Sequence, residues 1–313
     1  MDAKHIPVLL DESLDALDVG RGGLFVDATV GLGGHAEALL DRYPAARLAG
    51  IDRDPEARAA AALRLARFGD RARLVAGNFH RLAEAVGDAA PLAGVLADLG
   101  VSSLQLDSPH RGFSFRREGP LDMRMGGSEL TAEEIVNRYP EADLERIFRE
   151  YGEERQARRI ARTVVEERRR NPVTGTMQLK ALIDRAKGLD RAADGRGGPR
   201  EGRVDPATRV FQALRIEVNQ ELSGLAGFID QAVEMLEADG RLVVISYHSL
   251  EDRIVKNRLR QLDRGEVDRV TGRPLAETRL IEVLTRKPVR PSEGEVRANP
   301  RSRSARLRAA RRT

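Results

Sequence analysis

The chain has 313 residues, 41% of them hydrophobic, which is enough for one large or two modest domains with a real core. It contains no cysteine, so disulfides, thiolate metal sites and a cysteine nucleophile are excluded. No apolar run approaches the roughly 20 residues of a membrane span. The first residues also lack the basic-then-apolar layout of a signal peptide, so we expect a cytoplasmic protein without membrane contact.

Residues 24–100 alternate between short β-forming runs and helix-forming runs. The predicted strands are Leu24–Thr29, Leu48–Asp52, Arg73–Ala76 and Gly94–Leu99. The predicted helices are Ala36–Arg42, Pro55–Phe68 and Arg81–Val86. This alternation predicts a parallel α/β sheet, in which ligands bind outside the carboxyl ends of the strands.

A glycine-rich turn, Gly31-Leu32-Gly33-Gly34-His35, follows the first predicted strand. Such a turn lets the backbone approach a ligand, and the helix after it presents free N–H groups. Asp52 ends the next strand about 20 residues later, where an acid can hold ribose hydroxyls. The pattern predicts an adenosine-binding βαβ unit. It does not choose the cofactor, because the dinucleotide fingerprint is satisfied as well.

Asp27 stands immediately before that turn, and Asp98 ends the fourth predicted strand. A carboxylate at position 27 would repel a pyrophosphate but suits the sulfonium and ammonium of S-adenosylmethionine. The alternative is a turn residue that binds its own backbone. We expect Asp27, Asp52 and Asp98 to line one crevice.

Helical patterning replaces the alternation between residues 129 and 190, and residues 191–205 are glycine-rich. A long amphipathic pattern then runs from Phe211 to Leu236, ended by Asp239-Gly240. Further strands are predicted at Arg241–Ser246, Leu280–Thr285 and Ser304–Leu307. The helical block is therefore interpreted as an insertion in one α/β domain.

Arginines dominate the basic residues of this chain, whose pI is about 9.7. Residues 297–313 carry seven arginines and no acid, which favours contact with RNA. Four more arginines recur at helical spacing, with a pair of glutamates before them (Glu153 and Glu154) and a pair after them (Glu166 and Glu167). They form either a solvated charged face or a phosphate contact. These four are Arg155, Arg158, Arg159 and Arg162.

Many segments, read together, resemble one family along nearly the whole chain: the RsmH (MraW) family of bacterial methyltransferases that modify the N4 amine of a cytidine in 16S ribosomal RNA. The matching segments are His5–Leu10, Gly31–His35, Ile51–Pro55, Asp98–Ser103, Arg111–Phe115, Gly119–Met125, Tyr151–Arg155, Pro206–Arg209, Phe211–Ile216, Val218–Leu222, Ser246–Arg253 and Asn299–Ser304. One departure is Asp205, which stands where a histidine is expected before Pro206.

The resemblance implies a Rossmann-like class I methyltransferase sheet of seven strands with an inserted all-helical domain. It places the S-adenosylmethionine-dependent domain at residues 1–105 and 206–313, and an inserted substrate-recognition domain at 106–205. It implies S-adenosylmethionine as methyl donor and, as partner, the 16S rRNA of the small ribosomal subunit near its decoding centre. The oligomeric state, monomer or homodimer, stays open.

Carried over residue by residue, the resemblance implies a set of cofactor contacts. They are Gly33, Gly34, His35, Asp52 on the ribose, Phe79 against the adenine, Asp98 and Gln105.

Methyl transfer to an exocyclic amine requires a group that accepts charge from the amine. Asp98 is the candidate for this catalytic role, and binding of the cofactor alone is the alternative. Phe113 and Phe115 are candidates to stack the base, or else anchor their loop on the core. His248 is either a proton carrier, an RNA contact or a structural residue. The five histidines form no ligand-spaced pair, so no metal site is expected.

Two functions from other classes stay open at this stage. The glycine turn and Asp52 also allow a nicotinamide-dependent dehydrogenase, against which Asp27 argues. The second is a ribosome assembly factor that keeps the fold without catalysis.

Overall fold

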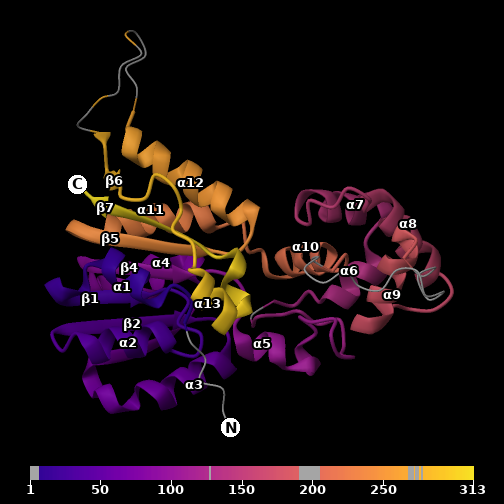
Figure 1. Cartoon of the computed structure of the whole chain (residues 1–313), viewed down its shortest axis with the longest axis horizontal. Coiled ribbons are helices and arrows are strands. Elements are labelled where there is room, and N and C mark those ends of the chain that lie inside the picture. The colour runs from indigo at the N-terminus through magenta and orange to yellow at the C-terminus, as the bar shows by residue number, and fades with distance from the viewer. Residues whose placement is uncertain (1–6, 127, 190–204, 267–270, 272–274, 276–277) are drawn as a thin grey trace. The chain divides into compact units, whose positions relative to one another are not determined.

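The computed structural model describes residues 7–126, 128–189, 205–266, 271, 275 and 278–313. The chain divides into two compact units (Figure 1). Met1–Ser102 and Leu222–Thr313 form the first, which we call the α/β unit. Ser103–Glu221 forms the second, the helical unit. The start of the expected His5–Leu10 segment and most of the glycine-rich stretch 191–205 lie outside the described residues.

A mixed sheet of seven strands, counted over the described residues, forms the α/β unit in the order β3-β2-β1-β4-β5-β7-β6. Strands β1 to β5 pair in parallel, and β7 is antiparallel to both of its neighbours. The strands are β1 Gly23–Asp27, β2 Ala46–Asp52, β3 Ala72–Ala76, β4 Leu92–Asp98, β5 Leu236–Ser246, β6 Ile281–Val283 and β7 Arg306–Arg312. The order reverses between β1 and β4, where a doubly wound sheet opens its ligand crevice.

Helices cover both faces of this sheet (Figure 1). One core packs the sheet against α1 (Leu10–Leu17), α2 (Gly34–Arg42) and α3 (Pro55–Leu65). The other packs it against α4 (Leu82–Val86), α11 (Leu225–Met235) and α12 (Ser249–Arg264). A short helix, α13 (Glu293–Ala298), precedes β7. Both faces are therefore buried, as the apolar strands require.

The named helices of the helical unit are α5 Ser103–Asp107, α6 Ala132–Arg138, α7 Glu141–Glu150, α8 Ala157–Arg168, α9 Thr176–Lys187 and α10 Thr208–Asn219. The apolar residues expected to form stripes in α7, α8 and α9 are all buried, among them Phe148, Ile160 and Leu179. Their three- and four-residue spacing places them on one face of each helix. No described helix in the chain is both long enough and apolar enough to cross a membrane.

The prediction of one long helix from Phe211 to Leu236 is wrong. The chain leaves α10 at Gln220, which adopts the left-handed conformation with φ 51°, and begins α11 after Gly224. A Cβ on Gly224 would lie 2.3 Å from the His80 ring, so the chain passes too close here for a side chain. Apolar spacing hides this break because both helices bury their apolar faces.

The last strand was also misplaced, at Ser304–Leu307. The structure pairs Arg306–Arg312 with β5 and β6 instead. Its only apolar residues are Leu307 and the adjacent Ala309 and Ala310, so the alternation typical of a strand is missing among the arginines.

Candidate active site

Three carboxylates stand at one edge of the sheet in the α/β unit. Asp27, Asp52 and Asp98 are the last residues of β1, β2 and β4, and these three strands are neighbours in the sheet. The negative charges of Asp98 and Asp52 raise the pKa of Asp27, which means that the three groups interact electrostatically. The predicted acidic edge is therefore present.

The glycine turn joins β1 to α2. Gly31 and Gly33 have φ values of 51° and 78°, which L side chains rarely adopt, and Gly33 is the N-cap of α2. Gly34 is required for a different reason, because a Cβ there would lie 2.6 Å from Pro7 Cγ. Helix α2 starts at Gly34, two residues before the predicted start, so its first N–H groups belong to the turn itself.

Asp52 is held by backbone donors on both of its oxygens. The Gly31 N–H donates to Oδ2 at 2.9 Å, and the Asp54 N–H donates to Oδ1 at 2.9 Å. Each carboxylate oxygen accepts more than one hydrogen bond, so acceptor capacity remains for the hydroxyls of a ligand. Burial raises the pKa of Asp52, while these two N–H groups lower it.

Asp27 and Asp98 are the most perturbed acids of the site. Burial raises the pKa of each to about 7. The Thr29 N–H donates to Asp27 at 3.2 Å and lowers the pKa of that carboxyl. The Tyr247 hydroxyl donates to Asp98 Oδ1 at 2.8 Å and likewise lowers the pKa of Asp98. Two carboxyls that are costly to ionise form a site that gains most from a cationic ligand. The hydrogen bond from the Thr29 N–H also shows that Asp27 binds the backbone of its own turn, which was the alternative role predicted for it.

His35 and Tyr247 bracket Asp98. The Nε2–H of His35 donates to the Val8 carbonyl at 3.0 Å, since a carbonyl can only accept. Its Nδ1 then faces Asp98 Oδ2 at 3.9 Å. The role of Tyr247 was not predicted, although its motif was recognised, because the contact joins residues that are 149 positions apart.

Phe79 lies in the loop after β3, half-buried, with its ring edge-to-face against Phe228 at 5.2 Å between centroids. Gln105 lies on α5 of the helical unit, where it is buried. Within the α/β unit, the sequence-predicted residues Gly33, Gly34, His35, Asp52 and Asp98 thus occupy the glycine turn and the ends of β2 and β4.

The structure favours a structural role for two residues offered as functional candidates. His248 is the N-cap of α12, and its Nδ1 accepts from the Glu251 N–H at 3.4 Å. Phe113 is buried at 7% exposure, which makes it an anchor of its loop. Phe115 is half-buried against Phe211, with ring centroids 4.9 Å apart.

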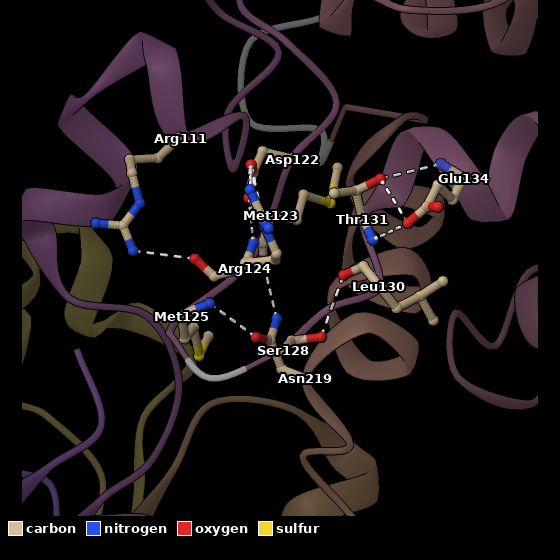
Figure 2. A network of polar contacts seen from close by, with 10 residues as sticks. All are labelled: Arg111, Asp122, Met123, Arg124, Met125, Ser128, Leu130, Thr131, Glu134 and Asn219. Atoms are coloured by element: carbon tan, nitrogen blue, oxygen red, sulfur yellow. Dashed lines mark hydrogen bonds and ion pairs between the residues drawn. The ribbon is translucent and has the colours of Figure 1, made fainter. Parts of the chain in front are cut away.

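The loop before α6 in the helical unit is held by a polar network (Figure 2). Buried Asn219 donates to the Met123 carbonyl at 2.7 Å and accepts from the Met125 N–H at 2.9 Å. The Arg111 guanidinium donates to the Arg124 carbonyl at 3.0 Å. Asn219 of the recognised motif Val218–Leu222 thus holds the backbone of another recognised motif, Gly119–Met125.

The expectation that the C-terminal arginines are unopposed is wrong for β7, and contact of this strand with RNA stays a prediction. Arg308 is buried, and its Nε donates to Asp252 at 2.6 Å. Arg306 also pairs with Asp252, and Arg311 pairs with Asp239 and Glu282. Residues 297–313 contain no acid, but in the fold Asp252 of α12, Asp239 of β5 and Glu282 of β6 form ion pairs with the arginines of β7.

The strand order, the antiparallel β7, the glycine turn and the acidic edge together define a class I methyltransferase sheet. A family model described as the MraW methylase family matches residues 2–313. The chain belongs to that family.

Curated relatives agree along nearly the whole chain. Ribosomal RNA small subunit methyltransferase H of Leifsonia xyli subsp. xyli is 48% identical, covering 99% of this chain and 94% of the relative. The protein of the same name from Carboxydothermus hydrogenoformans is 47% identical, covering 99% and 98%. A solved rRNA methylase from Streptococcus thermophilus aligns over 99% of both chains at 10% identity, with a TM-score of 0.42, which adds nothing to this assignment.

The expected methyltransferase class is thereby confirmed, and a methylase family supports the expected methyl donor, S-adenosylmethionine. No observation favours a nicotinamide-dependent dehydrogenase.

Proposed function

We propose that this protein transfers a methyl group from S-adenosylmethionine to the N4 amine of one cytidine in 16S rRNA, near the decoding centre of the small ribosomal subunit. The observation that carries the proposal is a pair of acids, the buried Asp27 and the half-buried Asp98, beside a glycine turn in a chain of the MraW methylase family. A sulfonium and an ammonium compensate these charges, whereas a pyrophosphate would add to them. Curated relatives named for rRNA support the substrate class.

The methyl donor is held by the residues that the resemblance assigns. The N–H groups of Gly33, Gly34 and His35 line the glycine turn, where α2 begins. Asp52 accepts from the ribose hydroxyls through oxygens already ordered by Gly31 and Asp54. Phe79 packs against the adenine, and Asp98 and Gln105 are the remaining residues that contact the methyl donor.

The reaction is an in-line displacement at the methyl carbon. The N4 lone pair forms the new N–C bond, the C–S bond breaks, and its electron pair stays on sulfur. The amine then carries an extra proton, which must leave. We assign to Asp98 the role of accepting from the N4 hydrogens and taking this proton, since a carboxyl with a pKa of about 7 gains and loses a proton near neutral pH.

Residues 1–105 and 206–313 form the methyltransferase domain in this proposal. The inserted helical domain, residues 106–205, recognises the substrate. Phe115, half-buried at the edge of the Phe211 ring, is the remaining candidate to stack the target base. The protein acts in the cytoplasm, where small subunits are assembled. Remote contacts must order the base, so free cytidine should be a poor substrate.

Isothermal titration calorimetry tests the cofactor assignment. The Asp52→Ala variant should bind S-adenosylmethionine about 1–3 kcal/mol more weakly than the wild type, the usual loss for hydrogen bonds to a charged group. Asp11→Ala is the matched control, because the Asp11 carboxylate is a surface group with 73% exposure. Equal affinity in the Asp52 variant and the control would remove Asp52 from the site.

Transfer of a labelled methyl group to purified small subunits tests the reaction. The wild type should label the RNA, and Asp98→Ala should label it far more slowly. A wild type that binds S-adenosylmethionine yet transfers nothing would support the alternative of a non-catalytic assembly factor.

A further inference from the structure

Four exposed arginines cluster at the start of α8 in the helical unit: Arg155, Arg158, Arg159 and Arg162. Arg158, Arg159 and Arg162 are neighbours on the surface of α8 through their three- and four-residue spacing, and Arg155 lies just before the helix. Together with Gln156 they line a surface hollow of about 300 Å³. The opposite side of the helix, with Ile160 and Val164, is buried.

Two of the four glutamates that flank these arginines in the sequence bind other cations instead. Glu154 is buried, and its carboxylate accepts from Lys187 Nζ at 2.6 Å. Glu167 accepts from Arg185 at 2.9 Å. Among the residues that the structure describes, no carboxylate lies within 4.0 Å of any of the four guanidinium groups. The sequence left a solvated charged face as an alternative, but Glu154 and Glu167 bind Lys187 and Arg185 rather than these arginines.

This arrangement costs the fold free energy. Like charges three and four residues apart repel each other. Arg158 and Arg159 also lie in the first turn of α8, which contains no acid, at the end of the helix where the dipole is already positive. The neighbouring helices differ, because Arg146 and Arg149 of α7 and Arg138 of α6 each pair with an acid on their own helix. An unbalanced cluster beside balanced ones indicates binding of an anion.

We propose that this arginine face of α8 binds the phosphate backbone of the RNA substrate. The inference rests on the proposed function and deepens it by naming the surface that holds the RNA. Guanidinium groups fit phosphate through paired donors. Among the described residues, no aromatic side chain lines the hollow, so phosphate contacts rather than aromatic stacking are expected to dominate. The face therefore positions the RNA without reading its sequence.

The test compares two triple variants with the same change of charge in the same unit. The first replaces the free cluster: Arg158→Gln, Arg159→Gln and Arg162→Gln. The control replaces the paired arginines: Arg138→Gln, Arg146→Gln and Arg149→Gln, whose side chains are 76%, 41% and 61% exposed. Binding of full-length 16S rRNA is measured as a function of salt, together with steady-state methylation of small subunits.

The cluster variant should lower the slope of log K against log salt by about 2, since each phosphate contact on single-stranded RNA contributes roughly 0.7. Its KM for small subunits should rise at least about tenfold with kcat retained, because backbone contacts bind substrate and transition state alike. Its melting temperature should equal or exceed that of the wild type, because the substitutions relieve repulsion. The control should match the wild type in slope and KM.

Equal losses in the two triple variants would overturn the proposal, since net charge alone would then explain them. A cluster variant with a lower melting temperature and an unchanged slope would also overturn it, in favour of a structural role. Failure of the proposed function looks different: the wild type itself would then transfer no methyl group to small subunits.

Discussion

Replacing Asp27 by asparagine should stabilise the empty protein and weaken its response to S-adenosylmethionine. Asp27 is 2% exposed, and asparagine keeps an oxygen that can accept from the Thr29 N–H while removing the charge. Burial and the charges of Asp98 and Asp52 raise the pKa of Asp27 from 3.8 to about 7. At about 1.4 kcal/mol per pH unit, this difference corresponds to about 4 kcal/mol of folding free energy, the most that the buried charge costs.

The sign follows from proton binding in the two states. Between pH 3.8 and about 7 the folded protein keeps a proton on Asp27 that the unfolded chain has lost. The wild-type free energy of unfolding therefore falls as pH rises through this range and loses nothing further from Asp27 above it. Asp27→Asn lacks this loss, so its advantage over the wild type should grow from pH 4 to pH 7 and persist at pH 8.

Urea unfolding at pH 5 and pH 8, with and without S-adenosylmethionine, measures both effects. A bound cation compensates the charge of Asp27, so the ligand should stabilise the wild type more than the variant. Asp11→Asn, at a carboxylate that is 73% exposed, should change neither quantity. The reasoning is refuted if the variant gains no stability relative to the wild type between pH 5 and pH 8, or if the ligand stabilises both proteins equally at pH 8.

Two further predictions concern Tyr247 and Arg308. Tyr247→Phe removes a donor that lowers the pKa of Asp98, so the acid limb of the kcat/KM pH profile should move to higher pH; an unmoved limb would show that Asp98 does not set it. Arg308→Gln removes the buried partner of the half-buried Asp252, leaves that carboxylate with Arg306 alone, and should lower the free energy of unfolding by about 3 kcal/mol in a urea titration. The salt dependence of RNA binding should stay the same in that variant, and a smaller slope would return Arg308 to the RNA contacts.

The sequence predicted the parts of the fold that depend on local patterns. The end of β2 at Asp52 was predicted correctly, whereas the predicted strands Leu24–Thr29 and Gly94–Leu99 run slightly past the ends of β1 and β4 at Asp27 and Asp98. The buried stripes of α7 to α9 could be predicted because the apolar spacing of a helix is local.

The parts that were missed depend on contacts between distant residues. The sequence of β7 suggests an unopposed basic tail, because the acids that pair with it, Asp252 and Glu282, are distant in the sequence. The Tyr247–Asp98 hydrogen bond exists only because β4 and β5 are neighbours in the sheet. Glu154 and Glu167 suggest a balanced face of α8 in the sequence, but in the fold they bind Lys187 and Arg185. Domain boundaries and the cofactor contacts stay predictions.

The central claim concerns one atom of one nucleotide, and mass spectrometry tests it directly. Small subunits that lack the modification are incubated with the protein and S-adenosylmethionine carrying a deuterated methyl group, and the 16S rRNA is digested to nucleosides and to mapped fragments. The account predicts a single labelled cytidine, with the label on N4, in a fragment from the decoding centre. A label on carbon 5, on a ribose oxygen or on another base would contradict it, as would RNA without label from a protein that binds the methyl donor.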